Sequence, residues 1–461
     1  MHAVPMKHMK STNFLAGVLI CAAVLFAGCS ERAAQLDQNW TSPVAVSSSI
    51  GGLGGAVRLR KYQGTVIGVQ SLGNGSAKLL FWSRASNSWS QALLSAPNGY
   101  LWGYAAIDPQ SNRILLPQGY AENEQFVMKA FIGTINDNRS LENMAEKEWI
   151  TDKKTLLGET GPNIKLNFPP VRPDRPNRYG VGLGIGILNA SEVYIPYCLG
   201  AITRSETNTF SHGPFNSGVF CSPDFGRTWQ LEKISDWDAV APTMCKTKRN
   251  FYYFAGIYPL WFSWKPAGTE KWAEPKAITK TFAMANGGFD VAGDGDTAHI
   301  CWMDRRHNMW RFNIEGPSIE NDDIVYCHRK DSDKDWSKEV LLSKGLLYSY
   351  APSVSAEGDK VVVVWAGIRT ADKHHTDMGP NDIYCTISND GGKTWAEPLK
   401  VTDGAKDGIT SGMPEVMLLN GVIHLFYIQG KREKPQPLSE GLSRGGQSPW
   451  PIYYTQRSFP D

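Results

Sequence analysis

The chain has 461 residues, and its 47 Lys and Arg residues almost balance its 45 Asp and Glu residues, giving a formal net charge of +2. This balance leaves no basic field of the kind that nucleic-acid-binding proteins need, so we exclude nucleic acid as a partner. The length suits two or three ordinary domains, but it also suits one closed array of repeats.

The first 28 residues are predicted to be an export signal. Lys7 and Lys10 form a short basic region, residues 14–27 are largely apolar, and Cys29 follows Gly28 directly. The apolar stretch is too short to cross a membrane comfortably. Small residues before a cysteine resemble the bacterial lipoprotein signal, with cleavage before Cys29 and lipid on its sulfur, and an ordinary secretory signal is the alternative.

The expected mature chain has a short tether, residues 29–38, and one folded domain, residues 39–461. Because Ser30 rather than Asp follows Cys29, we expect a lipid anchor in the bacterial outer membrane or at the cell surface, with the periplasmic face as the alternative. Loss of the signal removes two lysines and brings the charges of the mature chain into balance. We expect a monomer.

A tryptophan followed by a short alternating apolar run that ends near Ser or Thr recurs about every 59 residues. A period of this size, built from short strands, predicts a β-propeller. Seven copies predict an all-β, seven-bladed propeller, with six blades as the alternative. The copies begin at Trp40, Trp89, Trp149, Trp229, Trp272, Trp336 and Trp395.

One repeat shows four strands clearly, because its runs are rich in Val, Ile, Tyr and Trp and are bounded by Gly, Asp and Asn. These runs cover residues 351–358, 360–368, 381–388 and 395–402.

The last repeat supplies only three such runs, at residues 414–421, 422–430 and 451–458. We predict residues 40–47 as its fourth strand. Joining the two chain ends in one blade removes the free sheet edges of the array.

Two octets match the Asp-box pattern S-x-D-x-G-x-T-W, at residues 222–229 and 388–395. The aspartate can accept backbone N–H groups of its own turn, the glycine allows a positive φ, and the tryptophan buries a large surface between blades. Weaker copies stand at residues 332–336 and 86–89. We interpret the boxes as staples of the fold rather than as catalytic groups.

Strand alternation separates two faces of the predicted propeller. Asp-box turns share one face with the turns between first and second strands. The opposite face, called the loop face here, carries the long irregular segments, where function usually lies on a rigid scaffold. These segments are residues 158–180, 199–217, 303–323, 367–381 and 429–450.

Candidate binding side chains gather on two of these loops. Asp304, Arg305, Arg306 and Trp310 follow one strand end, and Arg369 lies in the corresponding loop of the next blade. The planar fork of arginine can grip a carboxylate or a sulfate, and an ion-pair network on the rim is the alternative.

The segments between blades add further candidates on the same face: Trp102, Arg178, Asp236, Asp238 and Tyr350. Aromatic side chains beside an axial cleft suit sugar stacking, whereas Asp and Tyr suit acid, base or nucleophile roles. A structural role is the alternative for each residue taken singly.

Six cysteines remain once the signal cysteine and Cys29 are set aside. We predict disulfides Cys198–Cys221 and Cys301–Cys327, because each pair lies on neighbouring second and third strands and the exported compartment permits oxidation. Buried free thiols are the alternative. There is no CxxC or HExxH spacing, so we predict no metal site and no cofactor, with a structural calcium ion left open.

Asp-box repeats in an exported propeller resemble the sialidase superfamily. Residues 182–188 and 193–196, followed by 217–222 and the first Asp-box, are similar to a middle blade of sialidases. The resemblance implies a β-propeller that acts on glycans. Sialidase chemistry requires an arginine triad, an Asp acid and a Tyr–Glu pair, yet residues 57–61 read VRLRK without the Arg-Ile-Pro signature, and Tyr350 is only a loose match for the Tyr.

Sialidases have six blades, and the seven-bladed relatives include lyases of uronic acid polysaccharides. The resemblance to those lyases implies catalysis by a His together with a Tyr or an Arg. His212, Tyr197 and Arg204 are the residues of this chain that match. We therefore expect an acidic-glycan glycoside hydrolase, with a lyase or a non-catalytic glycan- or protein-binding propeller as alternatives. The candidate catalytic residues are Asp236, Asp238, Asp304, Tyr350 and His212, and the candidate binding residues are Trp102, Arg178, Tyr197, Arg305, Arg306, Trp310 and Arg369.

Overall fold

In the computed structural model, Leu36–Asp461 forms one compact unit. The structure describes residues 35–460 apart from short gaps and several longer ones, and the account below concerns this part of the chain. No helix in it is long and apolar enough to span a membrane. The longer gaps are residues 50–56, 84–87, 96–105, 109–112, 136–140, 153–180, 205–209, 237–241, 280–287, 305–322, 369–379 and 432–448.

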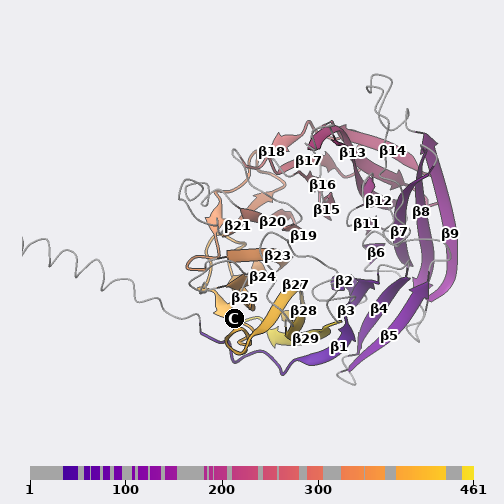
Figure 1. Ribbon diagram of the computed structural model, residues 1–461. Coiled ribbons are helices and arrows are strands. Elements are labelled where there is room, and N and C mark those ends of the chain that lie inside the picture. The colour runs from indigo at the N-terminus through magenta and orange to yellow at the C-terminus, as the bar shows by residue number, and fades with distance from the viewer. Residues whose placement is uncertain are drawn as a thin grey trace, which may run out of the picture. The chain divides into compact units, whose positions relative to one another are not determined.

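The described residues form seven antiparallel sheets that follow one another along the chain (Figure 1). Sheet 1 contains β2 (Val57–Tyr62), β3 (Thr65–Ser71), β4 (Ser76–Ser83) and β5 (Ser88–Ser95). Sheet 2 contains β6 (Ala106–Ile107), β7 (Arg113–Glu122), β8 (Gln125–Ile135) and β9 (Leu141–Asp152). Sheet 3 contains β10 (Val181–Leu183), β11 (Ile187–Asn189), β12 (Glu192–Arg204), β13 (Phe210–Ser222) and β14 (Gln230–Ser235).

The remaining sheets repeat the four-stranded pattern. Sheet 4 contains β15 (Thr243–Lys246), β16 (Asn250–Ala255), β17 (Trp261–Pro266) and β18 (Lys276–Ala277). Sheet 5 contains β19 (Phe289–Asp294), β20 (Thr297–Asp304), β21 (Asp323–Lys330) and β22 (Val340–Leu341). Sheet 6 contains β23 (Tyr348–Glu357), β24 (Lys360–Ile368), β25 (Asp382–Ser388) and β26 (Leu399–Lys400). Sheet 7 contains β27 (Ile409–Leu419), β28 (Val422–Lys431), β29 (Pro451–Ser458) and β1 (Val44–Ser48), and the 3-10 turn η2 (Ala405–Asp407) precedes it.

Closure of the last sheet by the N-terminal strand is confirmed. β1 pairs antiparallel with β29, with Val44 opposite Tyr454 and Ser48 opposite Pro451. In addition, β27 contacts β2, while first strands of neighbouring sheets contact one another along the chain. The sheets therefore form the closed circuit of a β-propeller, and the all-β fold class is confirmed.

Side chains on these first strands bond to the backbone of the next sheet, and we call these contacts the inner latches. Asp290 Oδ2 accepts the N–H of Val354 at 3.0 Å, and Ser353 Oγ accepts the N–H of Val416 at 3.2 Å. Glu415 Oε1 accepts the N–H of Leu59 at 3.2 Å. Each latch satisfies a buried donor and fixes the register between two sheets, because an unpaired buried N–H is costly.

The repeated tryptophans pack between sheets, as expected from the sequence. Trp395 of sheet 6 meets Tyr326 of sheet 5 edge-on, with ring centroids 4.7 Å apart. Trp89 of sheet 1 packs in the same manner on Phe426 of sheet 7, at 4.9 Å. A tryptophan on or just before an outer strand thus covers the middle strands of the preceding sheet, which buries large apolar surfaces.

Both Asp-boxes form the turn that their sequence predicts. Asp390 Oδ1 accepts the N–H of Thr394 at 2.9 Å, and Ser388 Oγ accepts the N–H of Gly392 at 2.9 Å. Gly392 has φ +89°, a conformation that favours glycine. In the first box, Asp224 Oδ1 accepts the N–H of Thr228 at 2.8 Å.

The fourth strand of sheet 6 is shorter than predicted. We expected a strand over residues 395–402, but β26 covers only Leu399–Lys400. Pro398 precedes it and has no N–H to donate, so the ladder is interrupted there, although Ala396 N–H donates to Ile387 O at 3.0 Å before the proline.

Both predicted disulfides are wrong, because all six cysteines are buried free thiols. Cys198 lies opposite Ser217 and Cys221 lies opposite Tyr194, so the two cysteines are four register positions apart along the β12–β13 pair. Cys301 lies opposite Tyr326, next to Cys327, which places the two thiols on opposite faces of sheet 5. Burial raises the pKa of the Cys301 and Cys327 thiols well above the usual range, and that of Cys385 to about 12.

Candidate functional site

Most of the predicted site residues lie outside the described part of the chain. For His212 the structure describes only the backbone, which pairs with Ile202 between β12 and β13. The candidates beyond the described residues, which remain predictions, are Trp102, Arg178, Asp238, Arg305, Arg306, Trp310, Arg369 and the lipidation site Cys29.

Asp304 is the last residue of β20 and has no exposed surface. Its Oδ2 accepts a hydrogen bond from the indole Nε1 of Trp302 at 2.8 Å. Asp304 lies opposite Asp323, the first residue of β21. A buried carboxylate held by an indole on its own strand is well ordered, but the contact orients it toward the protein interior rather than toward solvent.

Tyr350 lies near the start of β23, at the loop-face end of sheet 6, and is only 4% exposed. Its hydroxyl accepts a hydrogen bond from Nδ2 of Asn381 at 2.7 Å. The next residue, Ala351, has φ +49°, and the pairing with β24 shifts register just after Tyr350. The resulting bulge aims the ring into a cluster that includes Met303, the neighbour of Asp304.

Tyr197 lies on β12 of sheet 3, and Asp236 directly follows β14 of the same sheet. Both are far along the chain from Asp304 and Tyr350. Tyr197 is fully buried, and burial, followed by the charge of Asp236, raises its pKa well above the usual range. Asp236 is exposed and pairs with Lys233 at 2.6 Å. Tyr197 is therefore a core residue, and Asp236 forms a surface ion pair.

Two arginines that the sequence analysis did not select occupy the first inner strand. Arg58 Nη1 donates to Glu415 Oε2 at 2.6 Å, and Arg60 Nη1 lies 4.0 Å from Glu415 Oε1. The Glu415 side chain is 7% exposed, whereas that of Arg58 is 24% exposed. Burial raises the pKa of Glu415, although Arg58 and Arg60 oppose this, and the nearby Asp290 adds to it.

The sequence did contain one usable signal. Arg58 and Arg60 stand two residues apart on the predicted first inner strand, and Glu415 is the single acidic residue of the last inner strand. Residues i and i+2 share a face of a strand. What the sequence does not contain is the register that places Glu415 of β27 beside β2, because Glu415 is 356 residues from Leu59 and 357 from Arg58.

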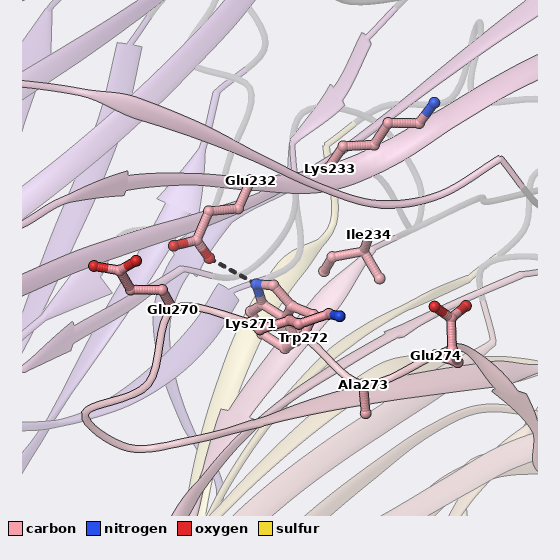
Figure 2. A pocket seen from close by; sticks show the side chains of 8 residues that line it. All are labelled: Glu232, Lys233, Ile234, Glu270, Lys271, Trp272, Ala273 and Glu274. Atoms are coloured by element: carbon pink, nitrogen blue, oxygen red, sulfur yellow. Dashed lines mark hydrogen bonds between the residues drawn. The ribbon is translucent and has the colours of Figure 1, made fainter.

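A hollow of about 340 Å³ opens at the outer edge between sheets 3 and 4, and we call it the rim hollow. It is lined by Glu232, Lys233 and Ile234 of β14 and by residues 270–274 before β18. Figure 2 shows Glu232 and Trp272 directed toward each other, with Glu270 and Glu274 on either side and Lys233 pointing away.

The floor of the rim hollow is fixed by a buried charge pair. Lys265 Nζ donates to both oxygens of Glu232, at 3.0 and 2.7 Å, and Trp272 Nε1 donates to Glu232 Oε2 at 2.6 Å. Only 4% of the Lys265 side chain is exposed, and it lies over the rings of Tyr194 and Trp272 at 5.2 and 5.3 Å. Charge-assisted bonds and two aromatic faces hold the carboxylate in one place.

No group of three or more His, Cys, Asp or Glu side chains in the described part of the chain is placed to hold a metal ion. No protein-family model and no curated protein matches the sequence.

Solved structures of sialidases are similar to the chain at low sequence identity. A Trypanosoma rangeli sialidase mutant with trans-sialidase activity has a TM-score of 0.43 at 8% identity, covering 92% of this chain and 60% of that one. Trypanosoma rangeli sialidase in complex with sialic acid gives 0.42 at 8%, covering 93% and 60%. NanB sialidase from Streptococcus pneumoniae gives 0.40 at 10%, covering 92% and 71%. The chain spans about three fifths of the trypanosomal sialidases.

Proposed function

We propose that the protein is a seven-bladed propeller, lipid-anchored through Cys29, that acts on an acidic extracellular glycan at its loop face. The seven sheets, the closing strand β1 and the contact between β27 and β2 support the blade number. The predicted export signal, residues 1–28, stands directly before Cys29 and supports the anchor. Cell fractionation of a Cys29→Ser variant tests the anchor, since loss of the lipid should move the protein out of the membrane fraction.

The observation that carries the glycan proposal is the Arg58–Glu415 pair. Arg58 is the second residue of β2 and so lies at the loop-face end of the first inner strand. Its guanidinium is held at 2.6 Å by a buried carboxylate and remains 24% exposed. A fixed, partly exposed guanidinium suits recognition of a sugar carboxylate, because its planar fork matches that group and little ordering entropy is lost on binding.

Glycoside hydrolysis is the proposed chemistry, with Asp304 and Tyr350 as the described candidates near the loop face. Polysaccharide lyase activity is the alternative chemistry, and unsaturated products would indicate it. A non-catalytic glycan-binding propeller is the second candidate function, and one observation favours it: Asp304 and Tyr350 are buried and already bonded to Trp302 and Asn381. A catalytic acid or nucleophile must reach the scissile bond.

The test uses the full chain with sialyllactose and trigalacturonate as acidic probes and lactose as the neutral reference. Binding is measured by calorimetry, and turnover by released reducing ends and by the ultraviolet absorbance of unsaturated uronates. We expect Arg58→Ala to weaken acidic-probe binding at least about tenfold, because a hydrogen bond to a charged group contributes about 1.5–3 kcal/mol. Arg58→Lys should recover only part, since the fork is lost.

Lys61→Ala is the matched control, because it removes one positive charge from the same strand. Its acidic-probe binding should stay within about twofold of the parent if Arg58 acts as a specific contact. Saturable binding without either product identifies a binding module. Binding of neither acidic probe, or equal losses in Arg58→Ala and Lys61→Ala, refutes the proposal.

A further inference from the structure

The rim hollow is a second constellation of charged and aromatic groups, formed by sheets 3 and 4 rather than by the inner strands. Glu232 on its floor accepts three hydrogen bonds from Lys265 and Trp272. Three bonds to two buried donors immobilise the carboxylate, so it presents a fixed acceptor edge to the space above it.

The mouth of the hollow is made by exposed side chains of one turn. Glu270, Lys271 and Glu274 are exposed and flank Trp272, which is 8% exposed itself. They come from the segment between β17 and β18, whose backbone is fixed by a bond from Ala273 N–H to Trp264 O at 2.8 Å. The hollow therefore combines a rigid floor with side chains at the mouth that can adjust to a ligand.

The carboxylates around the hollow outnumber the cations. Glu232, Glu270 and Glu274 are balanced only by Lys271 and by Lys265 behind the floor, because Lys233 points away (Figure 2) and pairs with Asp236 at 2.6 Å. An excess of carboxylates disfavours an anionic ligand and offers acceptors to hydroxyl groups. The hollow therefore suits an uncharged, hydroxyl-rich ligand, in contrast to Arg58, which suits an acidic one.

The size of the hollow also favours a small ligand. About 340 Å³ lies at the low end of the range for small-molecule pockets, which suits one sugar ring rather than a long chain segment. One indole edge beside fixed polar groups is a common arrangement for an orienting pocket of this kind.

We propose that the rim hollow binds one neutral monosaccharide unit of a glycan, as a binding site separate from the loop face. The ligand class rests on the proposed function, while the site rests on its own geometry. In a glycan that carries both acidic and neutral units, the two sites contact different parts of the polymer and add their affinities through effective concentration.

The experiment follows the indole N–H signal of Trp272 by NMR in the full chain, assigned with Trp272→Phe. Cellotriose and chitotriose are the neutral probes, and trigalacturonate is the acidic one. We expect a saturable shift of this signal with at least one neutral probe, at a Kd in the millimolar range, and none with trigalacturonate. Glu274→Gln combined with Lys271→Ala should weaken the response at least about fivefold.

Glu397→Gln is the matched control, because Glu397 occupies the same place in a second Trp-Ala-Glu-Pro motif, in sheet 6. It should leave the Trp272 response unchanged, as should Arg58→Ala. A flat Trp272 signal with both neutral probes, or a shift with trigalacturonate alone, overturns the inference. Loss of the response in Arg58→Ala also overturns it, since the two sites are then one. If a neutral probe shifts the Trp272 signal but the protein binds no acidic glycan, the rim site is supported and the proposed function is refuted.

Discussion

The tetrapeptide Trp-Ala-Glu-Pro occurs twice, beginning at Trp272 and at Trp395. In sheet 6 a complete Asp-box precedes it, and the indole of Trp395 donates to the carbonyl of Gly392, in the same turn, at 3.1 Å. In sheet 4 the turn has no Asp-box, and the indole of Trp272 donates to Glu232 of sheet 3 at 2.6 Å.

The indoles of these two copies thus find their acceptors in different places. In sheet 6 the acceptor lies in the turn itself, and the ring packs on the neighbouring sheet. In sheet 4 the indole joins two sheets through Glu232, whose charged partner is the buried Lys265. The two regions should therefore respond to different perturbations: the sheet 3–sheet 4 contact to loss of the Lys265 charge, and the Asp-box turn of sheet 6 to backbone strain and to acid.

The largest expected effect is at the sheet 3–sheet 4 contact. Lys265→Met should lower the free energy of unfolding by about 3–5 kcal/mol, because it leaves Glu232, only 19% exposed, without its charged partner. Urea denaturation measures the change. Lys393→Met in the Asp-box turn is the control and should stay within about 0.5 kcal/mol, since that lysine is exposed. A small loss for Lys265→Met would show that water already reaches Glu232.

The second prediction compares a glycine from each turn. Gly392 has φ +89°, and an added Cβ would lie 2.0 Å from the Tyr326 hydroxyl, whereas Gly268 has φ +80° and no atom within 4 Å of that position. Gly392→Ala should cost about 2–4 kcal/mol through strain and overpacking, and Gly268→Ala about 1 kcal/mol through strain alone. Thermal melts of both variants test this, and equal losses would contradict it.

The smallest effect concerns acid. Burial tends to raise the pKa of Asp390, but hydrogen bonds from Thr394, Ser388 and Lys393 outweigh it and lower the pKa from 3.8 to about 2. A lowered folded-state pKa means that the stabilisation is complete above about pH 4 and is lost as the pH falls toward 2. Because solvent screens this turn, we expect about 1 kcal/mol. Asp390→Asn should flatten that part of the pH–stability curve relative to the parent, and an unchanged curve argues against it.

The sequence predicted the fold well because the fold depends mainly on local sequence patterns. Each tryptophan repeat, each Asp-box and the closing strand depend on residues close together in the chain or on a simple count. The disulfide prediction failed for a physical reason: neighbouring strands do not imply neighbouring cysteines, and a shift of four register positions separates Cys198 from Cys221. Register depends on packing across the whole sheet, which spacing alone does not encode.

The candidate site was harder to predict than the fold. Loop candidates were chosen by residue type, and the two with described surroundings near the loop face, Asp304 and Tyr350, are buried and bonded internally. Arg58 and Glu415 were missed because they come together only when the first and last sheets meet. The rim hollow was missed because it forms only where sheets 3 and 4 meet, from residues about 40 positions apart in the chain.

The inner latches recur at a nearly constant interval. Asp290 reaches Val354 across 64 residues, while Ser353 reaches Val416 and Ser355 reaches Leu418 across 63. The first strand of each of sheets 5 to 7 thus carries an acceptor for a backbone N–H on the first strand of the next sheet, so these sheets are joined in the same way. The boundaries between these sheets are therefore the places where protein engineering could duplicate or exchange a sheet and keep the inner latches. A cut inside a sheet would leave one latch without its donor or its acceptor.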